Sequence, residues 1–155
     1  MSRADELGRL EQEVGVLIRR VKRVIGERAR AVHPDLQPAS YLMLMYLASE
    51  GPRRSSVLSD RFNVDKGAIS RQVQHLCELG LLDREPDPAD GRATLVSASA
   101  DAVHRMEAVD RDRRRWLEEQ LAGWSEADLR EFVTGLGRYN AALDRNAEAS
   151  AGSSR

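Results

Sequence analysis

The chain has 155 residues, of which 41% are hydrophobic and 32% are charged, the length and balance of one modest globular domain. Its formal net charge is −1, so bulk charge indicates neither a nucleic-acid partner nor a basic one. The single cysteine, Cys77, excludes an internal disulfide framework and a cysteine-cluster metal site. No apolar run reaches the roughly 18–20 residues that cross a bilayer, and the charged N-terminus lacks the pattern of a secretory signal. We therefore expect a soluble, cytoplasmic protein without membrane contact.

The first segment carries a heptad pattern, in which apolar residues alternate at spacings of three and four. This pattern predicts one long helix over 5–30 whose narrow apolar face needs a partner helix. His33-Pro34 ends it, because a residue before proline is pushed out of the helical region. The apolar positions are Leu7, Leu10, Val14, Leu17, Val21 and Val24.

A second helix is predicted to begin near Pro38, which suits a first helical turn, and to end at Gly51-Pro52. It is apolar on nearly every side, so we expect it to be central and buried.

Two short helices separated by a tight turn are predicted next. Ser55 or Ser56 can cap the first helix, and Asp65 can cap the second. Asn63 tolerates a left-handed backbone, which suits the turn between them. Gly80 ends the second helix in the same left-handed region.

After Gly80 the apolar period changes to two, which predicts a β-hairpin. Its strands contain Leu82 and Arg84 on one side and 94–97 on the other, with a long polar tip over 86–91 that its two prolines keep extended and unpaired. Two long helices are then predicted over 100–145. Ser99 can cap the first, and Ser125 with Asp128 resembles a capping box for the second. The small polar segment 146–155 is expected to be a disordered tail.

A helix, a tight turn, a second helix and a charged hairpin follow one another in the order typical of a DNA-binding helix-turn-helix module. Arg and Gln side chains can bind guanine and adenine edges, while Lys and Ser suit phosphate oxygens. Against this, segment 53–92 has seven basic and seven acidic residues, and a polar helix face is usually only a solvated face. The outward positions of the second helix are Lys66, Gly67, Ser70, Arg71, Gln72, Gln74 and His75.

The segment 57–99 resembles the MarR family of winged-helix transcription regulators. Residues 57–66 (VLSDRFNVDK) are similar to the family's first helix and turn, and 69–73 (ISRQV) to the start of its recognition helix. Residues 79–84 (LGLLDR) and 87–92 (DPADGR) resemble its wing, including the Asp-x-Arg signature at Asp90 and Arg92. The chain departs from the family at Ala98-Ser99 and Ala102, where Leu-Thr and then Gly are usual.

The resemblance implies a mainly α fold with a winged helix-turn-helix lobe over 38–98, inside a single domain over 1–145. Helices over 5–30 and 100–145 would form a homodimer, the latter through Trp116, Leu117, Leu129, Phe132, Leu136 and Leu143. Arg92 would enter the minor groove of double-stranded DNA, with Asp90 holding its guanidinium. The implied DNA contacts are Ser55, Lys66, Gly67, Ser70, Arg71, Gln72, Gln74, Asp90 and Arg92.

By the same resemblance the protein would be a repressor that binds an inverted repeat, with half-sites roughly one helical turn apart. It would be released by a small lipophilic or phenolic ligand. A ligand pocket could be lined by His33, Tyr41, Met45, Tyr46 and Trp116, although plain core packing also explains these side chains.

Two alternatives stay open: a winged-helix module that docks on a protein, and a DNA-binding regulator that responds to no ligand. Neither a catalytic motif nor a phosphate-binding loop is present, so we expect no enzyme activity and no cofactor. The three histidines lack the spacing of metal ligands. Cys77 is interpreted as a small buried hydrophobe.

Overall fold

The structure, a computed structural model, describes residues 1–152 and the side chains of residues 1–144. Its contacts divide the chain into two compact units, Met1–Arg111 and Asp112–Arg155, which are described separately. The predicted assignment of 1–145 to one domain stays a prediction. Where the sequence predicts a disordered tail from Asn146, helix α6 (Glu126–Gly152) continues to Gly152, and 153–155 lie outside the described residues.

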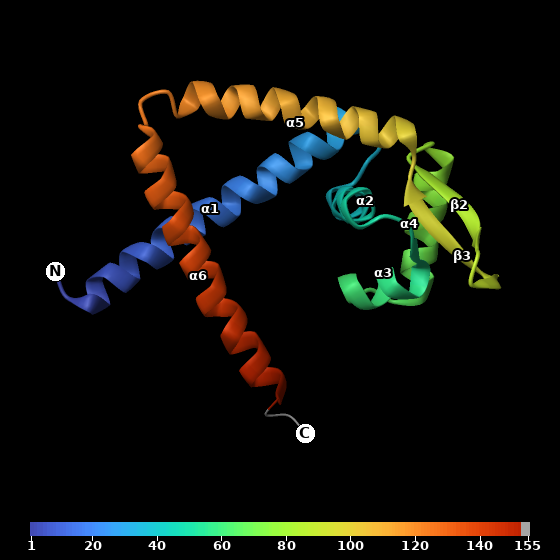
Figure 1. The fold of residues 1–155 in the computed structure, drawn as a ribbon, viewed down its shortest axis with the longest axis horizontal. Coiled ribbons are helices and arrows are strands. Elements are labelled where there is room, and N and C mark those ends of the chain that lie inside the picture. The colour runs from blue at the N-terminus through green and yellow to red at the C-terminus, as the bar shows by residue number, and fades with distance from the viewer. Residues whose placement is uncertain (153–155) are drawn as a thin grey trace. The chain divides into compact units, whose positions relative to one another are not determined.

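Helix α1 (Arg3–Val32) begins two residues earlier and ends two residues later than the predicted 5–30 (Figure 1). A capping box at its start extends it: the Asp5 backbone N–H donates to Ser2 Oγ (3.2 Å), and the Ser2 backbone N–H donates to Asp5 Oδ2 (2.8 Å). Only the end of the helix is buried, at Gly26, Ala29 and Val32. The heptad positions near its start stay between 43% and 45% exposed, namely Leu7, Leu10, Leu17 and Val21.

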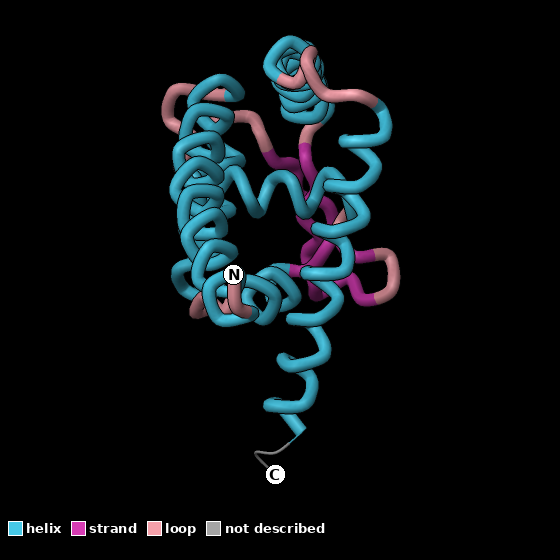
Figure 2. The backbone as a smooth tube through the Cα atoms, turned by 90° about the vertical axis from the view of Figure 1, so that its left-hand side faces the viewer, coloured by secondary structure: helices cyan, strands magenta, loops and turns pink. Residues whose placement is uncertain are grey.

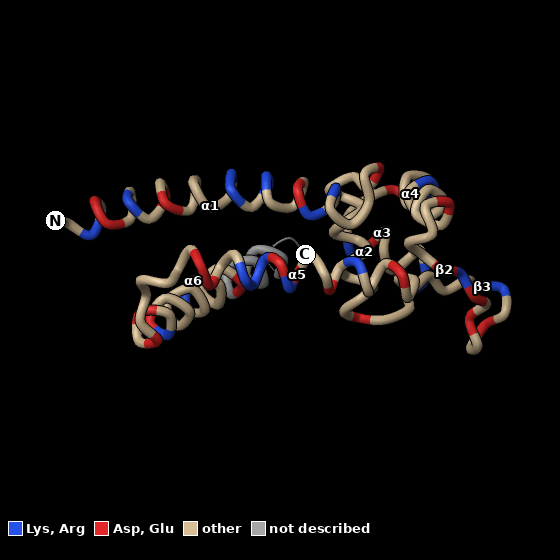
Figure 3. Tube along the Cα trace, turned by 90° about the horizontal axis from the view of Figure 1, so that it is seen from above, with Lys and Arg blue, Asp and Glu red and all other residues tan. Residues whose placement is uncertain are grey.

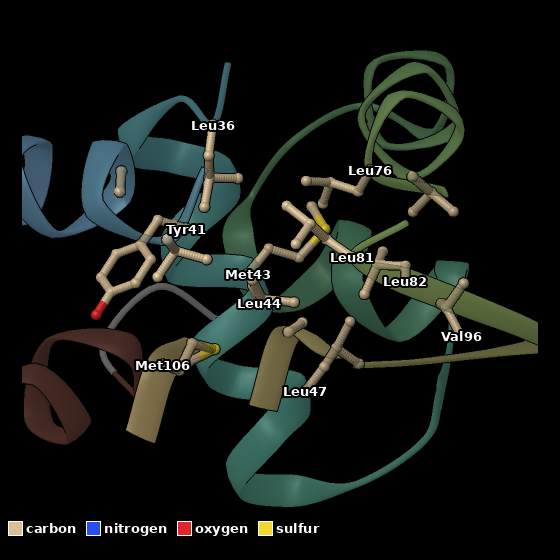
Figure 4. Close-up of a cluster of buried hydrophobic side chains, with 14 of the residues drawn as sticks. Leu36, Tyr41, Met43, Leu44, Leu47, Leu76, Leu81, Leu82, Val96 and Met106 are labelled. Carbon is tan, nitrogen blue, oxygen red and sulfur yellow. The ribbon is translucent and has the colours of Figure 1, made fainter. Parts of the chain in front are cut away.

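Helix α2 (Pro38–Glu50) forms the centre of the first unit, as its apolar composition predicts. Figure 4 shows its side chains facing those of α4 (Lys66–Glu78), the sheet and α5 (Ala100–Gln120). Leu42 and Met45 are the exceptions, at 40% and 37% exposed. The labelled members of this core are Leu36, Tyr41, Met43, Leu44, Leu47, Leu76, Leu81, Leu82, Val96 and Met106.

Helix α3 (Ser55–Phe62) is not capped by a serine, so that prediction is wrong. Its N-cap is Arg54, which makes no side-chain capping bond, because the helix starts directly after strand β1 (Arg53–Arg54). The turn that follows is as predicted, since Asn63 adopts the left-handed conformation at φ 50° and ψ 47°. The Ser59 hydroxyl closes the turn by donating to the Val64 carbonyl oxygen (2.5 Å).

Helix α4 is capped by Asp65, as predicted. The carboxylate accepts hydrogen bonds from the backbone N–H groups of Gly67 (2.9 Å) and Ala68 (3.1 Å). These bonds, that of Gly67 above all, lower the pKa of Asp65 below its ordinary value. The helix ends at Glu78 with Leu79 as its C-cap, and the predicted left-handed glycine, Gly80, follows at a φ of 73°.

The sheet has three antiparallel strands in the order β1-β3-β2, and strands make up a small part of the chain (magenta in Figure 2). Strands β2 (Leu82–Asp87) and β3 (Asp90–Ala98) form the predicted hairpin. The prediction that the whole tip is unpaired is wrong: Pro86 pairs with Thr94 and Asp87 with Asp90. Residues 88–89 form the turn, and a register shift leaves 91–93 without a partner on β2. Because β2 lies at the edge of the sheet, Pro86 removes no interior hydrogen bond.

Ser99 connects the end of β3 to α5. Its hydroxyl donates to the Gly80 carbonyl oxygen (2.7 Å) and accepts from the Ala102 backbone N–H (3.1 Å), which confirms its predicted capping role. The predicted box at the start of α6 also forms, with Asp128 Oδ2 accepting from the Ser125 backbone N–H at 2.8 Å. In the first unit, Arg105 Nη1 of α5 donates to the Val32 carbonyl oxygen at the end of α1 (3.2 Å).

Replacing Asp65 with alanine should lower the free energy of unfolding at pH 7, because two backbone N–H groups at the start of α4 lose their acceptor. The folded pKa lies below the unfolded value near 3.8, so the stabilisation is complete above that pH and is lost as the pH falls through the folded pKa. Urea denaturation at pH 7 and at pH 3 should therefore show a smaller difference between the two proteins in acid. Asp65→Asn is the matched control, since asparagine caps well and has no charge to titrate; an equal loss for both variants would contradict the prediction.

Candidate nucleic-acid interface

Helix α4 has one buried face and one polar face. Ile69, Val73 and Leu76 are at most 2% exposed, and their spacing of four and three places them on one stripe of the helix. The residues on the other side are therefore directed away from the core. Of the outward positions expected from the sequence, Lys66, Gly67, Ser70, Arg71, Gln74 and His75 are exposed, and Gln72 is half-buried.

The first turn of α4 brings Asp65, Gly67 and Arg71 together. A Cβ atom added at Gly67 would lie 3.3 Å from Asp65 Oδ1 and 3.5 Å from Arg71 Nη1. A side chain at this position would therefore crowd the capping carboxylate of Asp65, while its contact with Arg71 would be an ordinary one. The positive charge of Arg71 also contributes to the lowered pKa of Asp65.

Gln74 already has a partner within the helix. Its side-chain Nε2 donates to Glu78 Oε1 at 2.9 Å, across one helical turn. Gln74, expected to contact DNA, therefore has an internal partner that the spacing of four between the two residues could have indicated.

At the wing, Asp90 contacts Arg92 through the backbone. Asp90 Oδ1 accepts from the Arg92 backbone N–H at 3.1 Å. Among the residues that the structure describes, no ion pair joins the two side chains. Asp90 therefore fixes the main chain that carries Arg92, whereas the resemblance implies that it holds the guanidinium.

A second wing contact was missed by the sequence analysis. Asp87 is only 8% exposed, and its Oδ2 accepts from Arg54 Nε at 2.6 Å. Oδ1 of the same carboxylate accepts from the Ala89 backbone N–H at 2.9 Å. The Ala89 bond first, and then Arg54, lower the pKa of Asp87. The pair is separated by 33 positions, so helical or strand spacing could not indicate it.

In segment 53–92 the acidic and basic residues are equal in number but differ in how many have partners within the protein. Figure 3 shows acidic and basic positions interleaved along the hairpin. Four of the seven acidic residues, Asp65, Glu78, Asp87 and Asp90, accept hydrogen bonds from within the lobe. Arg92 and Lys66 are exposed and take part in none of the ion pairs between described residues. Equal numbers of charges therefore do not mean an equal display of charge.

The five candidate ligand residues have different surroundings. Tyr41 is 1% exposed within the core. Tyr46 is half-buried, packs edge-on against Phe62 (5.8 Å between ring centroids) and lies under the Arg61 guanidinium. His33 is half-buried and accepts from the Asp35 backbone N–H through Nδ1 (3.1 Å). Met45 is exposed, while Trp116 belongs to the second unit and is 48% exposed.

Two shallow hollows lie along α6. Their linings include Arg130, Glu131, Thr134 and Arg138. Within residues 1–152 no group of three or more His, Cys, Asp or Glu residues could hold a metal ion. Cys77 is half-buried rather than buried. None of the described helices is both long and apolar enough to cross a membrane.

Comparison with known proteins agrees with this geometry. A family model described as the MarR family matches residues 35–93. An uncharacterised HTH-type transcriptional regulator of Mycobacterium bovis is 32% identical over 127 residues, covering 81% of this chain and 87% of its own. The HTH-type transcriptional regulator YxaD of Bacillus subtilis, also uncharacterised, is 31% identical over 134 residues, covering 86% and 92%.

Solved structures show the same fold. RV1404 from Mycobacterium tuberculosis superposes with a TM-score of 0.76 at 20% identity, covering 92% of this chain and 94% of its own. The transcriptional regulator Tm0710 from Thermotoga maritima gives a TM-score of 0.63 at 25% identity, covering 88% and 98%. The chain contains a winged helix-turn-helix lobe whose second helix has an outward polar face. Its relatives are transcriptional regulators rather than enzymes. This chain belongs to the MarR family of DNA-binding transcriptional regulators.

Proposed function

We propose that the protein is a homodimeric repressor that binds an inverted repeat in double-stranded DNA. The observation that carries the proposal is the joint exposure of the α4 polar face and of Arg92 at the wing, both fixed by local hydrogen bonds. An α-helix is suited to the major groove, and an exposed arginine on a hairpin is suited to the minor groove. In a dimer the two copies of α4 would read half-sites about one helical turn apart.

Exposed apolar side chains support the dimer. In the first unit they lie along α1, where Ile18 is 50% exposed and several heptad positions are nearly as open. In the second unit, Trp124 and Phe132 pack edge-on at 5.7 Å between ring centroids, yet remain 43% and 53% exposed. Apolar patches of this extent are typical of protein interfaces. The other exposed members in the second unit are Trp116, Leu117, Leu129, Val133, Leu136 and Leu143.

The DNA contacts assigned to this function are those expected from the sequence. On α4, Lys66 and Ser70 would contact phosphates, and Arg71 and Gln72 base edges. Gly67 would permit close approach of the helix to the duplex. Gln74 would use its carbonyl oxygen or its second amide hydrogen, because one N–H of its side chain is donated to Glu78. Ser55, at the first turn of α3, would contact the DNA phosphate backbone. Arg92 would enter the minor groove.

Replacing Arg92 with alanine should weaken binding to every duplex by about 1–3 kcal/mol, because a permanently charged group leaves the minor groove. Fluorescence anisotropy at fixed salt measures the dissociation constant, and light scattering should show an unchanged dimer. Arg84→Ala is the control, since it removes the same charge from the body of the hairpin and should cost less. An unchanged dissociation constant for the Arg92 variant would remove the wing from the interface.

Replacing Gln72 with alanine should relax sequence preference more than it lowers affinity for random DNA, because an amide side chain reads a base edge. The comparison is between a duplex that the wild-type protein selects from a random library and a scrambled duplex of equal length. Equal losses on the two duplexes would reassign Gln72 to a phosphate contact.

A small lipophilic or phenolic effector is proposed to release the repressor. His33, Met45 and Tyr46 are the accessible members of the five candidate residues in the first unit, and Trp116 is exposed in the second. An effector can shift the equilibrium only if it binds the two conformations with different affinities. A panel of phenolic and lipophilic compounds should therefore raise the melting temperature and lower DNA affinity together. If no compound does either, the ligand-independent regulator replaces this part of the proposal.

A further inference from the structure

The buried carboxylate of Asp87 is the starting point. Among the described residues it is the only charged one that is buried. It accepts from the Ala89 backbone N–H through one oxygen, and through the other it pairs with both Nε and Nη2 of Arg54. A buried carboxylate without such partners would be costly, so the site depends on Arg54. Its lowered pKa keeps the carboxylate charged at neutral pH, which maintains the pair.

Arg54 occupies a junction in the fold. Its backbone pairs with Leu95 of the central strand β3, and it is also the N-cap residue of α3. Its side chain reaches the far end of β2, although β3 lies between β1 and β2. A single residue therefore connects the first helix of the helix-turn-helix to the turn of the wing.

The segment that carries Arg92 has little support from strand pairing. The register passes from Pro86↔Thr94 directly to Asp87↔Asp90, so residues 91–93 face no partner on β2. The position of Arg92 thus depends on the turn between the strands. That turn is held by Asp87 and, through Asp87, by Arg54.

We propose that Arg54 is a positioning residue for DNA binding: its ion pair with Asp87 holds the wing turn in place relative to α3 and α4, so that Arg92 and the α4 face engage one duplex together. The proposal rests on the proposed DNA-binding function. It assigns Arg54 no contact with DNA.

The matched comparison is between the two arginines of β1. Arg54→Gln and Arg53→Gln each remove one positive charge from neighbouring positions, but Arg53 pairs only loosely with Glu50 at 3.6 Å. The probe is a labelled duplex that the wild-type protein selects from a random library, with binding measured by anisotropy. Arg54→Gln should bind roughly tenfold more weakly, whereas Arg53→Gln should stay within about twofold of wild type. Equal losses for the two variants would overturn the proposal.

Asp87→Asn separates positioning from simple charge. Removing a negative charge strengthens DNA binding if only the overall field matters. If Asp87 holds the wing, the same change weakens binding because the Arg54 ion pair is lost. Tighter binding by Asp87→Asn would therefore overturn the proposal.

A double-mutant cycle then tests whether Arg54 acts through Arg92. In the Arg54→Gln background, Arg92→Ala should cost less than in the wild type, because the wing is already misplaced. Additive losses would assign Arg54 a direct phosphate contact and overturn the proposal. Should Arg54→Gln fail to fold by circular dichroism, Arg54→Lys keeps the charge but not the planar fork, and the same cycle is run with it.

A measurement without DNA keeps the two proposals distinguishable. If the wild-type protein selects no duplex, the proposed function fails, while the wing proposal is still tested by amide hydrogen exchange. Exchange at Ala89 and Arg92 should be faster in Arg54→Gln than in Arg53→Gln, because the turn has lost its anchor. Equal exchange rates in the two variants would overturn the positioning role.

Discussion

Burial of one apolar stripe on α4 is the constraint on which the interface depends. Ile69, Val73 and Leu76 pack against the core built around α2, and this packing fixes the rotation of the helix about its own axis. The polar residues on the opposite side are then directed away from the core by the rotation of the helix. Hydrophobic packing thus sets the orientation of α4, and this orientation decides which polar side chains are available for binding.

The elements that could be predicted from the sequence are those with a local physical signature. The left-handed turn at Asn63, the cap at Asp65 and the glycine stop at Gly80 each involve residues close together in the chain. The paired tip of the hairpin was missed because proline was taken to block pairing, which holds only for an interior strand. The serine cap of α3 was wrong because strand β1, only two residues long, shows no periodicity and places Arg54 at the helix start.

In the candidate site, too, the features with a local sequence pattern could be predicted, and those that depend on distant contacts could not. The outward face of α4 follows from a period of 3.6 residues, so its members could be named in advance. The bonds that hold the surrounding residues could not be named in advance. The contact between Arg54 and Asp87 spans 33 positions, and the sequence does not tell whether Asp90 accepts from the backbone amide or from the guanidinium of Arg92. Counting charges failed for the same reason, since a count does not record which carboxylates already have internal partners.

The hydroxyl of Ser99 makes two hydrogen bonds, one near the end of α4 and one at the start of α5. As donor it holds the carbonyl just beyond α4, and as acceptor it starts α5. Only serine and threonine can perform both tasks from one atom, so the range of side chains tolerated at this position is narrow for reasons of valence rather than size. Alanine would leave two main-chain groups without this partner, and aspartate would supply the cap but has no hydrogen to donate to the Gly80 carbonyl oxygen.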